Sequence, residues 1–233
     1  MQDRREMRCF PSARLPRRVV TFGLPLATLA ATARAAPPDP TDWLIEAQDP
    51  AARVRFRGDI IDIETPAGLT LWHRQRLSGA TRIRFAARPV TDGGPNDRLS
   101  DLNAFWMASD PASPNGDPRG RRSGQFEGYD SLRTYYVGIG GNGNTTTRMR
   151  RYTGRPGDRP LLPEHDRADA PALLRPDRWT DVELTADAGR IGVDRDGTPL
   201  FRWTDPVPYR AGWFGFRTTW SHWQLRDVRI ETA

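Results

Sequence analysis

The segment from residue 129 to residue 152 carries the side chains best suited to chemistry. Residues 129–136 read YDSLRTYY, and the Gly/Asn-rich run 140–144 and the arginine-rich run 148–151 follow. If residues 133–137 form a strand, Arg133 and Tyr135 share one face while Tyr136 points to the other. An arginine beside a tyrosine can neutralise a carboxylate and move a proton, which are the two requirements of a β-elimination next to a carboxylate.

Several residues suit each of these two roles. Neutralisation of the carboxylate suits Arg133, Arg148, Asn142 and Asn144, and proton transfer suits Tyr135, Tyr129, His165 and His222. We expect Arg133, Tyr135 and His165 to be the catalytic residues. His165 stands between Glu164 and Asp166, and adjacent carboxylates raise a histidine pKa. The alternative is a tyrosine-rich edge strand beside a surface arginine patch, without chemistry.

Other chemistries have less support in the sequence. Hydrolysis of a glycosidic bond needs two carboxylates, and Glu127, Asp130 and Glu164 are the candidates for a non-local pair. No Gly-x-Ser-x-Gly elbow is present, and the three histidines are not spaced as zinc ligands. We expect no metal site and no cofactor. The alternative is a Ca²⁺ ion held by Asp130 and the oxygens of the 140–144 loop. The sequence has no dense acidic loop, which argues against such a site.

Alternating apolar and polar residues predict an all-β domain. Period-two runs, typical of half-buried antiparallel strands, occur at 54–57, 60–64, 69–73, 81–85, 103–107, 133–137, 180–185, 190–195, 213–217 and 225–230. Asp196-Gly197 between two runs predicts a hairpin whose turn residues both have positive φ. Short strands with turn residues between them indicate a sandwich or barrel. We expect loops at 92–100 and 111–124 and a short helix near 161–175.

The first 35 residues read as an export signal. An arginine pair, Arg17-Arg18, precedes an apolar run that is too short to span a bilayer, and Ala33-Arg34-Ala35 has the small residues of a cleavage site. The pair makes the twin-arginine route plausible, although Val-Val-Thr after it leaves the Sec route open. A membrane-anchoring N-terminal helix is the alternative. We therefore expect residues 1–35 as signal, 36–41 as a proline-rich spacer and 42–233 as one domain, exported to the periplasm or the extracellular space.

Charge and cysteine content narrow the possible partners. The net charge of the chain is +6, but residues 1–35 hold seven Arg and two acids, so the excess over residues 36–233 is only +1. Nucleic-acid binding therefore has little support, and no other apolar run approaches spanning length, which argues against stable membrane insertion. The single cysteine, Cys9, lies in the expected signal, so the mature chain would have no disulfide or thiol chemistry.

The order of motifs resembles the concanavalin A-like lectin/glucanase jelly rolls. These motifs are DRWT at 177–180, RDG at 195–197, GWFGFR at 212–217 and LRDVRI at 225–230. A more specific resemblance rests on DLNAFW at 101–106, YDSLRTYY at 129–136, GGNGNTTTR at 140–148 and TTWSH at 218–222. These are similar to a secreted domain of unknown function, related to keto-disaccharide hydrolase-like domains and to small proteins found beside rhamnogalacturonan and other acidic-glycan lyases. The resemblance covers roughly residues 42–231.

This resemblance implies an antiparallel β-sandwich of the jelly-roll type that acts on a carbohydrate along its concave sheet. It implies an exported protein whose partner is a uronate-containing polysaccharide or oligosaccharide, cleaved by lyase-type β-elimination. The expected substrate-binding residues are Asn103, Trp106, Tyr129, Asn142, Asn144, Arg148, Arg217, Trp220 and His222.

Three other functions remain open at this point, and one of them is a structural envelope protein, which would have a flat surface without a groove. A lectin-like module would stack sugars on Trp106, Trp203, Trp220 or Trp223 without catalysis. A glycoside hydrolase would use a pair of the acids named above, although the Glu-x-Asp-x-x-Glu strand of the retaining jelly-roll glucanases does not occur in the sequence.

Overall fold

The computed structural model describes residues 36–233, and the predicted export signal 1–35, with Cys9, lies outside these described residues. Residues 36–39 lead into a single 3-10 turn, η1 (Pro40–Asp42), whose N-cap Asp39 accepts a hydrogen bond from the Thr41 amide at 2.8 Å. The first strand starts directly afterwards. No helix in the described part of the chain is long and apolar enough to cross a membrane.

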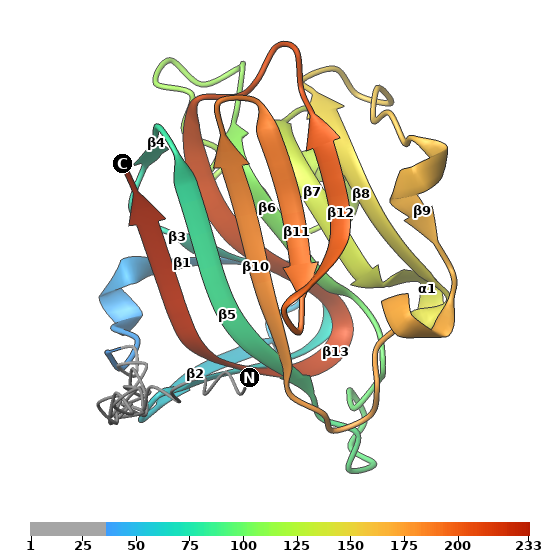
Figure 1. Cartoon of the computed structure of the whole chain (residues 1–233). Coiled ribbons are helices and arrows are strands. Elements are labelled where there is room, and N and C mark those ends of the chain that lie inside the picture. The colour runs from blue at the N-terminus through green and yellow to red at the C-terminus, as the bar shows by residue number, and fades with distance from the viewer. Residues whose placement is uncertain (1–35) are drawn as a thin grey trace, which may run out of the picture. The chain divides into compact units, whose positions relative to one another are not determined.

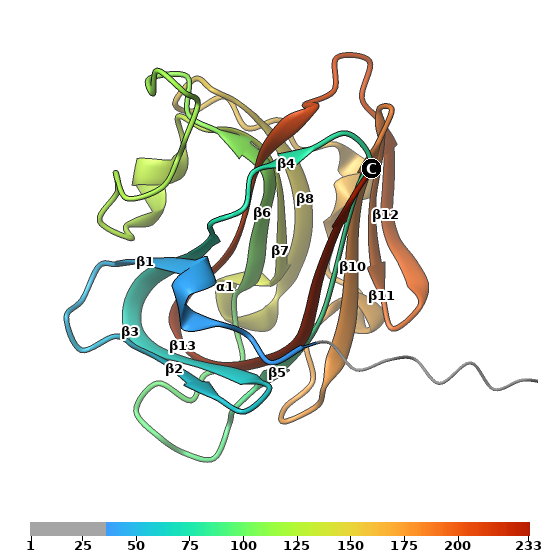
Figure 2. The same ribbon diagram turned by 90° about the vertical axis from the view of Figure 1, so that its left-hand side faces the viewer.

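The strands form one curled antiparallel sheet that folds into two layers (Figures 1 and 2). Its path runs β12-β11-β10-β5-β13-β6-β7-β8-β9. One layer contains β5 (Thr81–Pro89), β10 (Thr180–Asp187), β11 (Arg190–Arg195) and β12 (Thr198–Thr204). The facing layer contains β6 (Leu102–Ser109), β7 (Arg133–Gly140), β8 (Thr146–Thr153) and β9 (Asp166–Arg167). The predicted all-β antiparallel sandwich of the jelly-roll class is confirmed.

A single long strand, β13 (Ala211–Thr232), belongs to both layers. Its first part pairs with β6 over 213–217, and its last part pairs with β5 over 223–232. The opposite edge of β13 pairs with β4 (Leu77–Ser78) and with β3 (Ile60–His73). The N-terminal strands β1 (Trp43–Ala47) and β2 (Arg53–Arg57) both pair with β3. The predicted strands 60–64 and 69–73 are therefore one strand, as are 213–217 and 225–230.

The main core lies between the two layers. Alternate residues of each strand point inward, as with Ile83 and Phe85 of β5 and Ala104 and Trp106 of β6, and all of these are buried. The period-two pattern of the sequence reports this alternation directly. Asp196 and Gly197 have φ values of 50° and 73°, as the predicted hairpin requires.

A second apolar cluster covers the outer face of the β6–β7–β8 layer, beneath residues 110–132, which we call the covering segment. Phe105 of β6 stacks on both Trp72 and Tyr129, with centroid distances of 5.7 and 5.5 Å, and these two rings lie 6.3 Å from each other. The buried carboxylate of Glu46 accepts hydrogen bonds from Trp72 Nε1 at 2.9 Å and from the Tyr129 hydroxyl at 2.7 Å. Its other oxygen accepts from the backbone amides of residues 121 and 122. Glu46 thereby fixes the covering segment to the sheet.

The regions between the strands differ in part from the sequence-based predictions. Residues 92–100 and 111–124 both form loops as expected, and the second loop belongs to the covering segment, which also contains η2 (Phe126–Tyr129). In place of a helix at 161–175 there are two 3-10 turns, η3 (Pro163–His165) and η4 (Ala170–Ala172), on either side of β9. Three prolines between 160 and 171 explain the difference, because each removes a backbone N–H that a longer helix needs.

Candidate functional site

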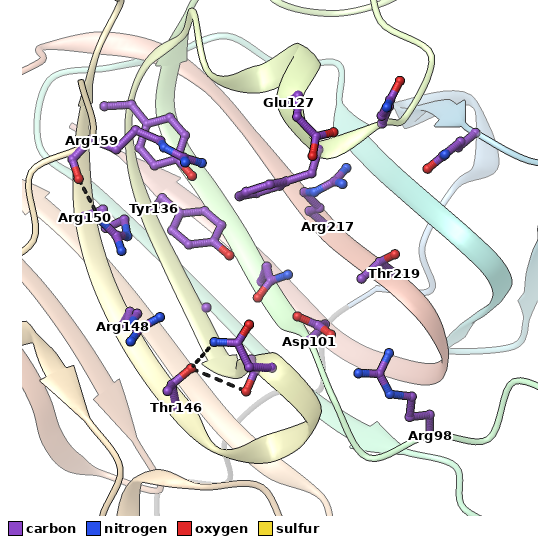
Figure 3. A pocket seen from close by; sticks show the side chains of 18 residues that line it. Arg98, Asp101, Glu127, Tyr136, Thr146, Arg148, Arg150, Arg159, Arg217 and Thr219 are labelled. Atoms are coloured by element: carbon purple, nitrogen blue, oxygen red, sulfur yellow. Dashed lines mark hydrogen bonds between the residues drawn. The ribbon is translucent and has the colours of Figure 1, made fainter. Parts of the chain in front are cut away.

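A cavity of about 580 Å³ opens on the outer face of the β6–β7–β8 layer, beside the covering segment (Figure 3). Its strand residues are Asn103 of β6, Tyr136 and Gly138 of β7, Thr146, Arg148, Arg150 and Tyr152 of β8, and Arg217 and Thr219 of β13. The remaining lining residues, from loops and turns, are Gln48, Arg98, Asp101, Gln125, Phe126, Glu127, Gly141, Asn142 and Arg159. We call this space the arginine cavity.

The cavity is positively charged. Five arginines line it, against the two carboxylates of Asp101 and Glu127, which leaves a formal excess of three positive charges. The volume lies within the range of ordinary small-molecule sites. Clefts lined by one sign of charge attract ligands of the opposite sign, so this cavity favours an anion.

Two of the five arginines are neutralised by the protein itself. The guanidinium of Arg148 donates to both carboxylate oxygens of Asp166, at 2.8 and 3.1 Å. Arg159 lies 2.8 Å from the carboxylate of Asp130. Both contacts place an acid of a neighbouring loop against a cavity arginine, so these two guanidinium groups have less charge to offer a ligand.

The other three arginines, Arg98, Arg150 and Arg217, have no carboxylate in ion-pair contact among residues 36–233. Arg150 donates only to the carbonyl of Arg159, at 2.7 Å, and burial lowers its pKa. Arg98 lies over the indole of Trp220, 4.7 Å from the ring centroid. Three guanidinium groups around one cavity thus have no ion-pair partner among the described residues, and Asp101 acts on Arg217 only at longer range.

Arg217 is the most deeply buried of these cations, with only 3% of the residue exposed. It donates to the Thr70 hydroxyl at 3.1 Å and to the Gly124 carbonyl at 2.8 Å, and its guanidinium lies 4.8 Å from the Tyr129 ring centroid. Burial lowers its pKa, but a guanidinium stays charged in proteins. A buried charge whose partners are all neutral is costly, and an anionic ligand would remove much of that cost.

Tyr136 and Asn103 form the floor of the cavity above Gly138. A Cβ atom at position 138 would lie 2.7 Å from the Tyr136 hydroxyl and 2.8 Å from Asn103 Oδ1, so only glycine leaves room for both side chains. Asn103 Oδ1 is buried and has no hydrogen-bond partner within the described residues. Burial raises the pKa of Tyr136 well above its usual value, so its phenol stays neutral and can donate a hydrogen bond. Figure 3 shows this phenol pointing into the middle of the cavity.

The 140–144 turn closes one end of the cavity, and its two asparagines have left-handed backbone conformations. Asn142 and Asn144 have φ values of 55° and 61°. Asn142 lines the cavity and donates to the Thr146 hydroxyl at 3.2 Å. Asn144 instead exchanges hydrogen bonds with the backbone of Leu174, at 2.8 and 3.1 Å. Of the two, only Asn142 is in a position to meet a ligand in the cavity.

The structure brings four of the residues predicted from sequence to the cavity: Asn103, Asn142, Arg148 and Arg217. Tyr135 lies on the other face of β7, in the core between the layers, where its hydroxyl donates to Asp205 at 2.7 Å. The alternation of Tyr135 and Tyr136 is as expected, but Tyr136 is the one that faces the cavity. The physical reason is that the inner face of β7 packs against the opposite layer, so the face that carries Tyr136 is the one that borders the cavity.

The other predicted residues also lie outside the cavity lining. His165 is buried against Phe201 and Trp203, with Nε2 3.3 Å from the Arg202 carbonyl, and Arg133 is exposed at the start of β7. Trp106 is buried in the core, and Tyr129 lies under Arg217 with its hydroxyl on Glu46. The geometry therefore does not bring Arg133, Tyr135 and His165 to the cavity: Tyr135 and His165 both pack against Trp203, at centroid distances of 6.2 and 6.4 Å, and Arg133 is exposed at the start of β7.

Trp220 and His222 lie next to the cavity. Trp220 follows the lining residue Thr219 and is 51% exposed. The ring nitrogens of His222 lie 2.8 Å from Asp97 and 3.2 Å from Asp62. These contacts raise the pKa of His222 and help to lower that of Asp62 to about 2. His222 thus anchors the loop that carries Arg98 rather than facing the cavity.

Most of the aromatic and cationic lining was not predicted from the sequence. Tyr136, Arg150, Tyr152, Arg159 and Arg98 were not proposed as ligands. Arg150 and Tyr152 could have been predicted, because they alternate with Arg148 along one strand and all three side chains share a face. Arg98 and Arg159 reach the cavity from separate loops, and no local pattern indicates that.

No group of three or more His, Cys, Asp or Glu side chains that could hold a metal ion occurs among residues 36–233. Asp130, the residue considered for Ca²⁺, instead lies against Arg159 and accepts a hydrogen bond from the Gly157 amide. The carboxylates that line the cavity are Asp101 and Glu127. Of the three acids considered for hydrolysis, only Glu127 is among them.

Fold and cavity together define a β-sandwich protein with a ligand-sized, cationic cavity on the outer face of one sheet. Residues 63–228 match a family described as a domain of unknown function, DUF6250, and the chain belongs to that family. The comparison with curated proteins gives no match.

Several solved structures share the fold. A protein of unknown function with a galectin-like fold from Bacillus subtilis has a TM-score of 0.62 and 16% identity, over 82% of this chain and 90% of that one. The carbohydrate-binding module CBM66 from Bacillus subtilis has a TM-score of 0.54 and 10% identity, over 82% and 96%. The carbohydrate recognition domain of Emp46p in its metal-free form has a TM-score of 0.54 and 11% identity, over 82% and 87%. At these identities the likeness establishes the fold.

Proposed function

We propose that this protein binds an acidic, uronate-containing glycan in the arginine cavity. The observation that carries the proposal is the set of three guanidinium groups, Arg98, Arg150 and Arg217, that lack a carboxylate partner around one cavity. Unpaired arginines are suited to a planar carboxylate, which they can hold through paired hydrogen bonds.

The neutral lining supports a sugar rather than a simple anion. The amides of Asn103 and Asn142 and the phenol of Tyr136 offer both donors and acceptors, as a ring of hydroxyl groups requires. Two proteins of similar fold are named as a carbohydrate-binding module and a carbohydrate recognition domain, which agrees with a sugar ligand. A few converging polar groups with aromatic walls are typical of small-molecule sites.

The test compares a charged glycan with its neutral counterpart. The purified protein is titrated calorimetrically with polygalacturonate, alginate and fully methyl-esterified polygalacturonate, at low and high salt. We expect binding to one or more of the acidic polymers, weakened by salt, and none to the methyl ester, because esterification removes the carboxylate charge. Equal binding to the ester and the acid would refute the proposal.

A matched pair of variants locates the binding. Arg150→Gln removes an unpaired cavity cation, whereas Arg190→Gln removes an exposed cation that is paired with Asp187 on another strand. We expect the Arg150 variant to lose roughly 10-fold in affinity, as for one charge-assisted hydrogen bond, and the Arg190 variant to bind as the unmodified protein does.

Lyase-type β-elimination is a second candidate function. The observation that favours it is the meeting of Tyr136 and Asn103 over Gly138, in the same cavity as Arg217. In this arrangement Arg217 and Asn103 would neutralise the uronate carboxylate, and a lining carboxylate, Asp101 or Glu127, would accept the C5 proton. Neutral Tyr136 would donate a proton to the leaving oxygen as the C4–O bond breaks and the C4=C5 double bond forms. The test follows the ultraviolet absorbance of unsaturated uronate during incubation with the same polymers. Tyr136→Phe should abolish a rise, whereas new reducing ends without absorbance would indicate hydrolysis instead.

A further inference from the structure

One exposed aromatic side chain stands directly beside the arginine cavity. Among residues 36–233 the exposed large apolar side chains are Ile45, Val207 and Trp220, and only Trp220 is aromatic. It is 51% exposed, although tryptophan is a residue that folding normally buries to a large extent. Its neighbour in sequence, Thr219, lines the cavity.

The backbone at Trp220 is held in a conformation that a bulky residue rarely adopts. Its φ is 40°, and the pairing of β13 with β3 changes register between Thr219 and Ser221. Such bulges turn a side chain out of the regular alternation, and strained positions of this kind cluster at functional sites. Without the bulge the indole would follow the alternation of β13 rather than stand out beside the cavity.

The indole is also fixed by contacts that connect it to the cavity. Trp220 Nε1 donates to the Pro95 carbonyl at 3.2 Å, and the guanidinium of Arg98 lies 4.7 Å from the ring centroid. Arg98 itself lines the cavity, and the contact of its neighbour Asp97 with His222 at 2.8 Å holds this loop to β13. Arg98 contacts the indole, Thr219 precedes Trp220 in the sequence, and both residues line the cavity. The indole of Trp220 therefore lies at the edge of the cavity.

We propose that Trp220 forms an outer subsite on which a second sugar ring of the bound glycan stacks. The proposal rests on the proposed function, because the ring belongs to the chain whose uronate occupies the arginine cavity. The apolar C–H face of a pyranose matches a rigid, half-exposed indole, and Arg98 lies between the two subsites. The site therefore takes an oligosaccharide or a polymer segment, and a monosaccharide fills only part of it.

The test measures how affinity depends on chain length. Galacturonate oligomers from one to six units are titrated into the protein, Trp220→Ala and Trp179→Ala. Trp179 is a partly exposed tryptophan with its own arginine contacts, Arg88 and Arg226, and it does not line the cavity. We expect Trp220→Ala to lose roughly 3- to 10-fold in affinity for the longer oligomers and nothing for the monomer. Trp179→Ala should match the unmodified protein at every length.

The outcomes separate this inference from the proposed function. Equal affinities of Trp220→Ala and the unmodified protein for the hexamer would overturn the outer subsite and leave binding in the cavity intact. An affinity that does not increase with length would overturn it as well. If acidic oligomers fail to bind while neutral ones bind with a loss in Trp220→Ala, the acidic ligand is refuted and the aromatic subsite is retained.

A second measurement, fluorescence quenching, uses the unmodified protein and so does not depend on whether a variant folds. Acrylamide quenching of tryptophan fluorescence in the unmodified protein reports exposed indoles, and Trp220 is the exposed one among the described residues. Hexamer should protect this fluorescence from acrylamide, and monomer should not. Equal quenching with and without hexamer, under conditions where calorimetry detects binding, would contradict the stacking of a sugar on Trp220.

Discussion

The two layers of the sandwich each carry a hollow of similar volume, and the hollows differ in charge. The arginine cavity, of about 580 Å³, has five arginines and two carboxylates. A hollow of about 470 Å³ across β5, β10, β11 and β13 has two arginines and four carboxylates, from Arg84, Arg229, Asp181, Glu183, Asp194 and Asp227. Size alone therefore does not distinguish them as sites for an anion.

The more informative difference is whether the charges are paired. In the second hollow Arg84 donates to Glu183 at 2.7 Å, and Asp194 is held by Arg202. In the arginine cavity Arg98, Arg150 and Arg217 have no such partner in the described chain. Paired charges are typical of a solvated face, and unpaired cations around a buried floor are typical of a site that awaits its counter-charge.

The strongest test of this contrast removes the most deeply buried unpaired cation. Arg217→Gln should lower the affinity for an acidic glycan by roughly 100-fold, as for the loss of a bidentate charge-assisted contact. The matched variant Arg202→Gln, in the other layer, should bind as the unmodified protein does. Calorimetry measures both, and circular dichroism checks the folding of Arg217→Gln, because Arg217 also packs on Phe126 and Tyr129. If a folded Arg217→Gln keeps its affinity, the unpaired arginines do not explain why one hollow would bind an anion and the other would not.

A smaller effect is expected from filling the floor of the cavity. In Gly138→Ala the new methyl group would meet the Tyr136 hydroxyl and Asn103 Oδ1 within 2.8 Å, so both must move. We expect the affinity to fall about 10-fold and the free energy of unfolding to fall by about 1–3 kcal/mol. Gly128→Ala is the control, since its Cβ would have nothing closer than 3.8 Å. If both variants bind equally well, Tyr136 and Asn103 do not contact the ligand.

The paired charges beside the cavity predict a dependence of stability on pH. Hydrogen bonds to Asp62 and Asp97 raise the pKa of His222 above 6.5, so its contribution to stability is complete below pH 6.5 and is lost as the pH rises through the raised pKa. The pKa of Asp62 is lowered from 3.8 to about 2, chiefly by His222, so its contribution is present above pH 3.8 and is lost as the pH falls toward 2. Urea unfolding should give the largest free energy of unfolding between these limits.

His222→Asn provides the control for that dependence. The variant should lose the decrease at high pH and should be less stable by about 1–3 kcal/mol near pH 6, because it leaves two buried carboxylates with fewer donors. Arg55, which lies 3.2 Å from Asp62, and Gln224 remain as donors in the variant. An unchanged pH profile in His222→Asn would assign the dependence to other groups.

The smallest effect is expected in the second hollow. Arg84 and Glu183 are both partly exposed, with 39% and 29% of their side chains accessible, so their ion pair contributes little. Arg84→Gln should change the free energy of unfolding by less than about 1 kcal/mol and leave glycan binding unchanged. A loss of binding in this variant would show that the unpaired arginines are not the determinant.

The fold was predictable from the sequence to a greater extent than the site. The runs at 81–85, 180–185 and 190–195 correspond to β5, β10 and β11, because alternation follows directly from the pleat of a half-buried strand. The positive φ values at Asp196 and Gly197 follow from local turn chemistry in the same way. Continuous strands such as β3 and β13 were divided in the prediction, since bends and bulges interrupt the pattern without ending the strand.

The site was harder to predict because both faces of β7 are apolar. The covering segment buries the outer face, so Tyr135 and Tyr136 are both buried, and alternation alone cannot say which one meets a ligand. Arg148 and Arg217 were predicted as binding residues and line the cavity, whereas Arg98 and Arg159 depend on how distant loops fold over the sheet. Charge pairing, which separates the two hollows, is a tertiary property and leaves no trace in local sequence.

The position of β13 has a consequence for how the chain folds during synthesis. This strand lies between β5 and β6 in the sheet and also pairs with β3 and β4, yet residues 211–232 follow all the other described strands in the chain. Until then the nascent chain has two incomplete half-sheets with open edges and no strand to join them. Because such non-local pairings must wait for distant segments, we expect the sheet to close slowly and only after residues 211–232 have been made, with the open strand edges dependent on chaperones in the interval.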